Sequence, residues 1–431
     1  MPLCKTYYVN AETGRDSFDG LSEATAFASL RAVNRLTLQP GDRVRLACGS
    51  VFAGQYLHLT CCGSKDAPIV VGAYGDGPAP RIDADGQGIW YQDYGCPLDS
   101  PTHVYRGYVS SAVLLYDAAY VTVQDLEITN HSGAVLGESY SQPDKMERTG
   151  VAVVAKDKGT CRGITLRDLA IHDVNGNVYD KHMNNGGIYM TALSPADEAA
   201  TGPARFADVL VEGCYLYRVS RWGLAVGYTY AHAHFQGAAL EEAPFLKYGH
   251  ENVTIRDNVF WEGNQTNIHI EPIIQELDPN NPLHKNMTIE GNTFYLNNTS
   301  AISALSVENL TIRDNAFKRA DDGIDSELTV STDQLQPGGK AGLKLEMSTN
   351  VNDAGLFSFR GCKNVVLSGN TYGDGLNTRA SVSDMDTSEI HLEDEDVRLN
   401  EDSIKQFLLK DCKVQYISTD ESVVRVDGAG G

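Results

Sequence analysis

The sequence of 431 residues lacks the features that mark membrane-spanning and nucleic-acid-binding proteins. It has no run of about 18 apolar residues, so a transmembrane helix is excluded. Basic residues are scarce, with 35 Lys and Arg against 57 Asp and Glu, and the formal net charge of −22 opposes binding to phosphate backbones and anionic lipid surfaces. We therefore expect neither nucleic acid nor a membrane as a partner.

Paired cysteine motifs and a secretion signal are also missing. The nine cysteines show no CxxC or metal-finger spacing, and only Cys61 and Cys62 are close together. Residues 1–9 lack the apolar stretch of a signal peptide and enter a strand-like run at once. These features predict reduced thiols and a cytoplasmic location. The GxSxG, HExxH and phosphate-loop motifs are absent as well.

What the sequence does contain is a repeat with the alternation of a β-strand. Seven copies begin at Val121, Ile164, Val209, Val253, Met287, Leu310 and Val365, with 43, 45, 44, 34, 23 and 55 residues between successive starts. With the first residue counted as zero, positions 0, 2 and 7 are apolar in every copy. The shortest spacing is the bare repeat, and the longer spacings indicate inserted loops or a second turn.

A polar position inside the repeat completes the pattern. Position 5 is Asn in the last four copies, at Asn258, Asn292, Asn315 and Asn370. An Asn at one corner of every coil can donate and accept along the stack, which makes a side-chain ladder. Short strands, a repeat near 20 residues and a polar ladder predict an all-β fold, a right-handed parallel β-helix of the pectate-lyase-like solenoid type.

The two ends differ from the repeat. Residues 22–38 have helical spacing and predict a helix that caps the open N-terminal end. We place the β-helix domain, with this cap, at residues 1–380, and an acidic C-terminal extension with some β content at 381–431. The acidic run from Asp384 to Asp396 could hold a structural calcium ion, although a solvated surface is the alternative that we favour.

Stacked coils bring equivalent positions together, about 4.8 Å apart. Position 8 holds His172, Tyr217 and Trp261 in successive copies, and position 9 holds Asp173, Arg218 and Glu262. The following strand adds further candidates at Tyr189, Trp222, Asn267, His269 and Glu271. Aromatic rings beside polar groups suit a sugar, so this face predicts an oligosaccharide-binding wall, with ordinary surface packing as the alternative.

The turn after Asp173 is about nine residues longer than its neighbours. It carries Asp180 and His182, and Gly176 allows it to fold Asp180 back toward Asp173. Glycoside hydrolysis needs two carboxyl groups, one protonated and one ionised, and a retaining enzyme holds them roughly 5–6 Å apart. Asp173 and Asp180 are the predicted pair; the alternative is that they only order the loop through Asx turns.

Two resemblances support this interpretation. The opening residues 7–14, with Asp19-Gly-Leu-Ser22 and Pro40-Gly-Asp42, resemble the start of many β-helix proteins of carbohydrate metabolism. The long turn resembles the retaining β-helical lacto-N-biosidases, which carry two aspartates seven residues apart. This second resemblance implies Asp173 as the acid–base group and Asp180 as the nucleophile, release of lacto-N-biose from human milk oligosaccharides, and a helical chaperone-like partner that can be a separate chain.

Two other functions remain open at this stage. A polysaccharide lyase would use Arg218 or Lys181 as a base, with calcium held by Asp173, Glu262 and Glu271. A non-catalytic carbohydrate-binding β-helix would keep the aromatic residues but would not need both carboxylates. His232, His234 and His250 could suggest a metal site, but their Ala-rich surroundings favour a loop beside the cleft.

Overall fold

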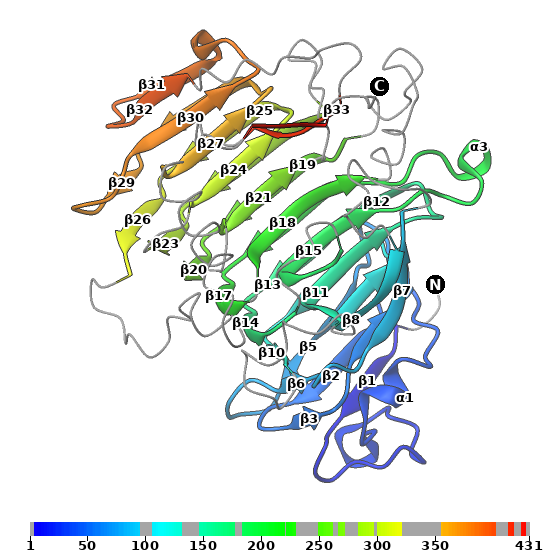
Figure 1. Cartoon of the computed structure of the whole chain (residues 1–431). Helices are drawn as coiled ribbons and strands as arrows, with labels where there is room; N and C mark the ends of the chain where they lie inside the picture. The colour runs from blue at the N-terminus through cyan, green and yellow to red at the C-terminus, as the bar shows by residue number, and fades with distance from the viewer. Residues whose placement is uncertain are drawn as a thin grey trace.

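The computed structural model shows a parallel β-helix built from three sheets. It describes residues 4–94, 106–131, 146–176, 183–219, 221–229, 249–261, 266–271, 283–296, 300–320, 355–401, 413–417 and 424–427. Except for β7 on β8, every pairing between the named strands of these three sheets is parallel and joins successive coils. The fold predicted from the repeat is therefore confirmed (Figure 1).

Sheet A, the first of the three, contains the start of each repeat. Its strands are β1 (Thr6–Val9), β2 (Arg43–Ala47), β5 (Ile69–Tyr74), β9 (Val121–Gln124), β13 (Ile164–Arg167), β16 (Arg205–Glu212), β19 (Glu251–Arg256), β22 (His284–Glu290), β25 (Val307–Arg313), β28 (Lys363–Ser368) and β31 (Ile390–Glu393). A short strand, β12 (Thr160–Arg162), also pairs with β16.

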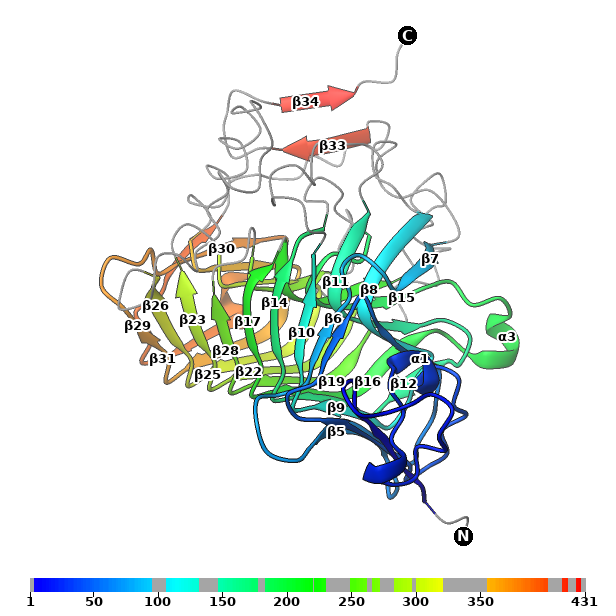
Figure 2. The same cartoon turned by 90° about the horizontal axis from the view of Figure 1, so that it is seen from below.

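Sheet B contains the apolar position 7 of each repeat and the predicted position 8 residues. Its strands are β3 (Val51–Ala53), β6 (Arg81–Asp83), β10 (Glu127–Asn130), β14 (Ala170–Val174), β17 (Tyr215–Val219), β20 (Val259–Trp261), β23 (Thr293–Leu296), β26 (Ala316–Arg319) and β29 (Thr371–Tyr372). Figure 2 shows β10, β14, β17, β23 and β26 standing in this order along the solenoid.

Sheet C closes each coil and faces the viewer in Figure 1. Its strands are β4 (Leu57–Leu59), β8 (Arg106–Tyr116), β11 (Glu147–Ala155), β15 (Gly186–Ala192), β18 (Trp222–Thr229), β21 (Ile268–Glu271), β24 (Ile302–Leu305), β27 (Phe357–Arg360), β30 (Arg379–Ser383) and β32 (Arg398–Glu401). One further strand, β7 (Ile89–Asp93), lies antiparallel on β8.

The predicted asparagine ladder is present at the corner between sheets A and B. Asn258 donates to Asn292 over 2.9 Å, Asn292 to Asn315 over 3.0 Å, and Asn315 to Asn370 over 2.9 Å. Asn370 in turn donates to Glu395 at 3.1 Å. Each side chain also binds backbone groups of the preceding coil, so the ladder satisfies buried polar groups at every turn.

Position 4 of the repeat has left-handed backbone in every copy, which restricts the residues that fit there. The occupants are Asp125, Asp168, Gly213, Asp257, Gly291, Asp314 and Gly369. At Gly291 φ is +66°, and a Cβ would lie 2.5 Å from Oδ1 of Asp257 in the preceding coil. The carboxylate of one coil thus covers the glycine of the next, which explains why Asp and Gly alternate over the later coils.

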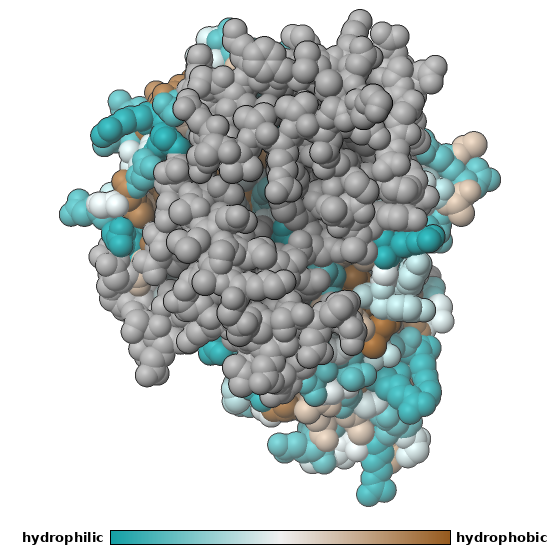
Figure 3. Space-filling view, in the orientation of Figure 1, coloured by the Kyte–Doolittle hydropathy of each residue, from teal (hydrophilic) through white to brown (hydrophobic). Residues whose placement is uncertain are grey.

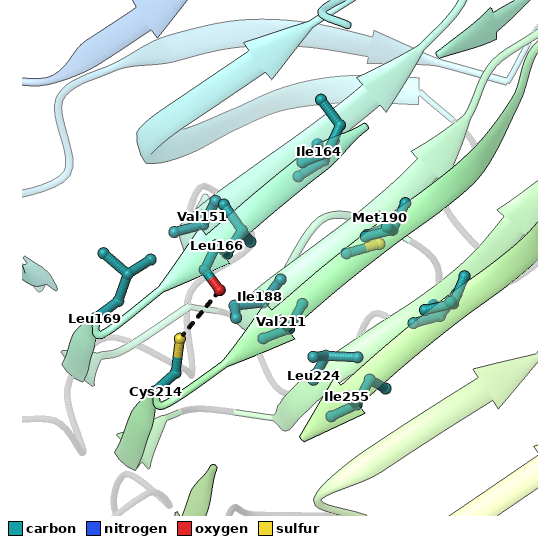
Figure 4. Packing of buried hydrophobic residues seen from close by; sticks show 14 of the residues in the cluster. Val151, Ile164, Leu166, Leu169, Ile188, Met190, Val211, Cys214, Leu224 and Ile255 are labelled. Carbon is teal, nitrogen blue, oxygen red and sulfur yellow. Dashed lines mark hydrogen bonds between the residues drawn. The ribbon is translucent and has the colours of Figure 1, made fainter. Parts of the chain in front are cut away.

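One apolar core fills the solenoid along its length. Position 7 forms a column of rings, in which Phe294 stacks on Phe260 at 5.1 Å and on Phe317 at 4.9 Å between centroids. Figure 4 shows the packing in the middle coils, where Leu166 and Val211 of sheet A meet Ile188 and Leu224 of sheet C. Beside them the Cys214 thiol donates to the Leu166 carbonyl at 3.7 Å.

Both ends differ from the prediction. Residues 22–38 form two short elements, the 3-10 turn η1 (Glu23–Thr25) and the single helical turn α1 (Leu30–Val33), rather than one helix. The coil also continues past residue 380, because β31 pairs with β28 and β32 pairs with β30. The C-terminal β content is present as an antiparallel hairpin, β33 (Lys413–Ile417) and β34 (Val424–Asp427).

The acidic run at 384–396 is tied to protein donors. Asp384 accepts a hydrogen bond from Arg360 at 2.7 Å, and Glu389 accepts one from the Asn364 backbone at 3.0 Å.

No group of three or more potential metal ligands occurs in the part of the chain that the structure describes. Nor does that part contain a helix long and apolar enough to cross a bilayer. The visible coloured surface in Figure 3 is mainly hydrophilic, with small hydrophobic areas between.

Candidate functional site

Asp173 lies at a bulge at the end of β14, where sheet B turns toward sheet C. Toward the next coil, His172 pairs with Tyr217 and Val174 with Val219, so Asp173 lies beside Arg218 as predicted. Both have left-handed backbone, with φ of +50° and +52°. Toward the preceding coil, the register shifts and Asn130 pairs with Val174. Asn130, at position 9 of the preceding copy, therefore does not lie beside Asp173, because Asp173 is the extra residue of the bulge.

Both carboxylate oxygens of Asp173 have cationic or polar donors. Oδ2 lies 2.7 Å from Nδ1 of His172, and Oδ1 lies 2.7 Å from Nη2 of Arg218. Burial opposes the charged form, but the hydrogen bond from His172 and the charge of Arg218 outweigh it, and the pKa of Asp173 is lowered. The free protein therefore holds Asp173 as a carboxylate.

The sequence interpretation missed a second carboxylate at this site. Nε2 of His172 lies 3.1 Å from Oε1 of Glu127 on β10, and Glu127 also pairs with Arg81 of β6 at 3.5 Å. Glu127 is 45 residues from His172 in sequence. It could have been found by reading position 6 of the preceding coil together with position 8, since the two lie diagonally across adjacent strands.

The aromatic residues of sheet B stack on one another in pairs. His172 and Tyr217 stack at 4.6 Å with 12° between their planes, and Trp261 and Tyr295 stack at 5.1 Å with 27°. Lys318 lies over the Tyr295 ring at 5.5 Å. These residues point out of the solenoid, but His172 and Trp261 are buried. The ring faces that point toward the neighbouring coil are therefore covered within each stacked pair, and sugar binding by these residues stays a prediction.

The candidates on sheet C belong to a separate apolar cluster on its outer face. Tyr189 and Trp222 pack there with ring centroids 5.7 Å apart, and Trp222 stacks on His269 at 4.3 Å. Tyr189 and Asn267 are completely buried, and Trp222 is 4% exposed. Their burial places Tyr189 and Asn267 within this cluster, and their part in sugar binding stays a prediction.

The side chains of four predicted site residues lie outside the part of the chain that the structure describes. Asp180, His182 and Glu262 lie outside the described residues, as does the side chain of Glu271 at the end of β21. The predicted separation of the Asp173 and Asp180 carboxyl groups therefore stays a prediction. His250, the one described member of the suggested histidine group, is buried in a corner stack with His284.

Comparison with known proteins identifies the family. No family model matches the chain. Over 92% of its length it is 36% identical to the GH136 lacto-N-biosidase from Eubacterium ramulus, covering 68% of that crystal structure's chain with a TM-score of 0.65. It is also 38% identical over 288 residues to a lacto-N-biosidase of Bifidobacterium longum. This chain belongs to the GH136 lacto-N-biosidase family.

The curated relatives are much longer proteins. The chain spans 18% of the length of the Bifidobacterium protein, whose match covers 59% of the chain. An alpha-1,3-galactosidase A of Peterkaempfera griseoplana is 34% identical over 179 residues, or 42% of the chain and 24% of that protein. Both of these relatives are glycosidases by name.

Buried polar contacts anchor both ends of the long turn in this GH136 chain. Before residues 177–182, Asn175 accepts two hydrogen bonds from Arg148, at 2.7 Å and 3.1 Å. After them, the Asn184 backbone and side chain donate to Gln92, and Asn185 donates to Glu147 at 2.8 Å. All six side chains are at most 8% exposed. The segment that carries Asp180 therefore leaves and re-enters the solenoid at fixed points.

These anchors were missed by the sequence interpretation. Glu147 and Arg148 open β11, while Asn184 and Asn185 directly precede β15. Polar residues at the start of an otherwise apolar strand were the available signal, since an unpaired buried amide or carboxylate is costly and so implies a partner.

Proposed function

We propose that this chain is a glycoside hydrolase that releases lacto-N-biose from human-milk-type oligosaccharides. The observation that carries the proposal is the Asp173 carboxylate, held by His172 and Arg218 at the start of an anchored turn, in a chain of the lacto-N-biosidase family. A carboxylate held at fixed geometry, with a second carboxyl group within reach, is what hydrolysis of a glycosidic bond requires. We propose Asp180 as that second group.

The roles within the pair follow from two lines of reasoning that differ. The family resemblance gives Asp173 the acid–base role and Asp180 the nucleophile role. The contacts in the free protein favour a charged Asp173, which suits a nucleophile or a base and does not suit the acid of the first step. The proposal rests on the pair, and chemical rescue assigns the roles.

The described contacts do not favour the other functions weighed above. A lyase would need Arg218 as an uncommitted base, but its Nη2 lies 2.7 Å from Asp173. A pure binding module would present ring faces to the sugar, but the rings of sheet B stack on one another.

The decisive test measures release from a lacto-N-biosyl aryl glycoside. Wild type should turn it over, and Asp173→Asn and Asp180→Asn should each lose ~10²–10⁴-fold in kcat/KM. Asp208→Asn is the matched control, because Asp208 also has left-handed backbone and accepts from an arginine, Arg162, at 3.0 Å. Full activity in Asp173→Asn, or no turnover by the assembled wild type, would reject the proposal.

Azide rescue then separates the two roles. In a retaining enzyme, azide restores activity to an alanine variant of the nucleophile with a glycosyl azide of inverted configuration. In an alanine variant of the acid–base group, the glycosyl azide has retained configuration. The anomeric configuration of the product from Asp173→Ala therefore assigns Asp173, and that from Asp180→Ala assigns its partner.

We also propose, from the family resemblance, that a helical chaperone-like chain assists this protein. Expression with and without candidate helical chains encoded beside it, followed by light scattering of the soluble fraction, tests this. A chain that is monomeric and active when produced alone would reject it.

We also propose a structural calcium ion and a cytoplasmic location. The calcium ion is tested by measuring the melting temperature with and without EDTA, and the location by cell fractionation.

A further inference from the structure

We propose that Asn130 is a positioning residue, whose buried side chain fixes the bulge that sets the Asp173 carboxylate between His172 and Arg218. The inference rests on the proposed function for its kinetic meaning. It adds to that function a residue that acts on Asp173 only through the backbone. Its structural content can be tested without any activity.

The bulge at Asp173 forms against Asn130. Asn130 pairs with Val174, while the residue before Asn130 pairs with the residue before Asp173, so one step along β10 faces two steps along β14. The Asn130 carbonyl accepts a hydrogen bond from the Asn175 backbone at 3.3 Å, which closes the ladder beyond the extra residue. Asp173 has φ of +50°, and left-handed backbone is unfavourable for a residue with a Cβ. The contacts around the bulge must therefore hold it there.

The side chain of Asn130 ties three segments of the chain to this corner. Oδ1 accepts from the Gly86 backbone at 3.0 Å, in the corner of the preceding coil. Nδ2 donates to the Thr149 carbonyl at 3.0 Å, in β11 of the same coil, and to Oγ of Ser110 at 3.1 Å, in β8 of the preceding coil. The side chain is completely buried, so water is not available to replace a lost contact. These bonds therefore fix where the Asn130 carbonyl meets β14.

The other end of the bulge is held as well. Arg148 donates to the side chain and the carbonyl of Asn175, at 2.7 Å and 3.1 Å. Asn175, two residues after Asp173, is thus held by Arg148 and, through its backbone, by Asn130. The Asp173 carboxylate lies 2.7 Å from Arg218 in the next coil. If the Asn130 side chain is lost, its carbonyl and the bulge can shift, and the carboxylate shifts with them.

Asn130→Ala removes the side-chain contacts and keeps the backbone carbonyl. A displacement of a reacting group by about 1 Å can cost about 10²-fold in rate. Because the displaced group acts on the chemical step more than on binding, kcat for the lacto-N-biosyl aryl glycoside should fall by ~10–100-fold, while KM changes by less than about 3-fold.

Asn292→Ala is the matched control. It also removes a completely buried amide that links neighbouring coils, but at the corner between sheets A and B. Both variants are assayed well below the temperature at which they unfold. A merely structural role for Asn130 would leave kcat of the folded protein unchanged in both, whereas we expect the loss only in Asn130→Ala.

A double-mutant cycle on stability needs no activity. Asn130 and Arg218 lie two coils apart, with Asp173 in the coil between them, so the described contacts link the two through Asp173 and its neighbours. Arg218→Gln should lower the urea midpoint of unfolding in the wild-type background, because Asp173 loses its cation. It should lower the midpoint less in Asn130→Ala, where Asp173 is already displaced, and as much as in wild type in Asn292→Ala.

The two measurements separate this inference from the proposed function. If wild type hydrolyses nothing but the cycle shows this coupling, the proposed function fails and the structural content of the inference stands. Wild-type kcat in Asn130→Ala, an equal loss of kcat in Asn292→Ala, or the same midpoint shift from Arg218→Gln in all three backgrounds overturns it. If Asn130→Ala does not fold, Asn130→Ser, which keeps a hydroxyl at the corner, replaces it in both measurements, with smaller changes of the same sign.

Discussion

Asn292 offers the sharpest test of what holds the solenoid together. The side chain is completely buried. Its Oδ1 accepts from the backbone and side-chain nitrogens of Asn258, at 3.0 Å and 2.9 Å, and its Nδ2 donates to Ile255 O and Asn315 Oδ1, at 2.9 Å and 3.0 Å. Asn292→Ala removes all four contacts and leaves two donors of Asn258 without this acceptor inside the protein.

The expected loss follows from those two donors. An unsatisfied buried donor costs about 1–3 kcal/mol, so Asn292→Ala should lower the free energy of unfolding by about 4 kcal/mol. Urea unfolding followed by circular dichroism, extrapolated linearly to water, measures it.

A second ladder supplies the control. Asp208, Asn252, Asn286, Asn309 and Asn364 form an exposed row, linked for example by Asn309 to Asn286 at 2.9 Å and Asn286 to Asn252 at 3.2 Å. Asn286 has φ of +56°, which glycine adopts freely, and its groups reach water, so Asn286→Gly should cost less than about 1 kcal/mol. A loss below about 1 kcal/mol in Asn292→Ala, or equal losses in both, would refute the reasoning.

Two further predictions concern the core and the pH dependence of stability. Phe294→Ala removes a fully buried ring stacked on both sides and should lower the free energy of unfolding by about 3–5 kcal/mol, whereas Phe294→Leu should lose clearly less, as measured by urea unfolding. Burial lowers the pKa of His250 to about 4. The unfolded chain takes up this proton below about pH 6.5 and the folded chain does not until about pH 4, so stability should fall by about 3 kcal/mol across that window. In His250→Gln this part of the fall should be absent; an unchanged slope between pH 6.5 and 4 would contradict the assignment.

The backbone plan of this protein could be predicted from the sequence. Alternation at positions 0, 2 and 7 placed sheets A and B, and the asparagines at position 5 are the ladder. Stacking of equivalent positions also placed Asp173 beside Arg218. These features follow from a period along the chain, because each coil repeats the backbone path of the one before it. Weakly patterned segments were predicted less well: residues 22–38 were expected to form one helix.

The candidate site was only partly accessible in this way. The sequence supplied Asp173, Arg218 and the stack of His172 on Tyr217. It did not supply the contact between His172 and Glu127, nor the fact that the stacked rings hide one another's faces. The repeat places Glu127 diagonally across from His172, but whether their atoms meet, and which ring faces are covered, depends on side-chain rotamers that the repeat does not encode. The sequence thus determined which residues share a face of the coil, and the tertiary structure decided which of their atoms meet, because hydrogen bonds and ring contacts depend on ångström-scale geometry that no periodicity specifies.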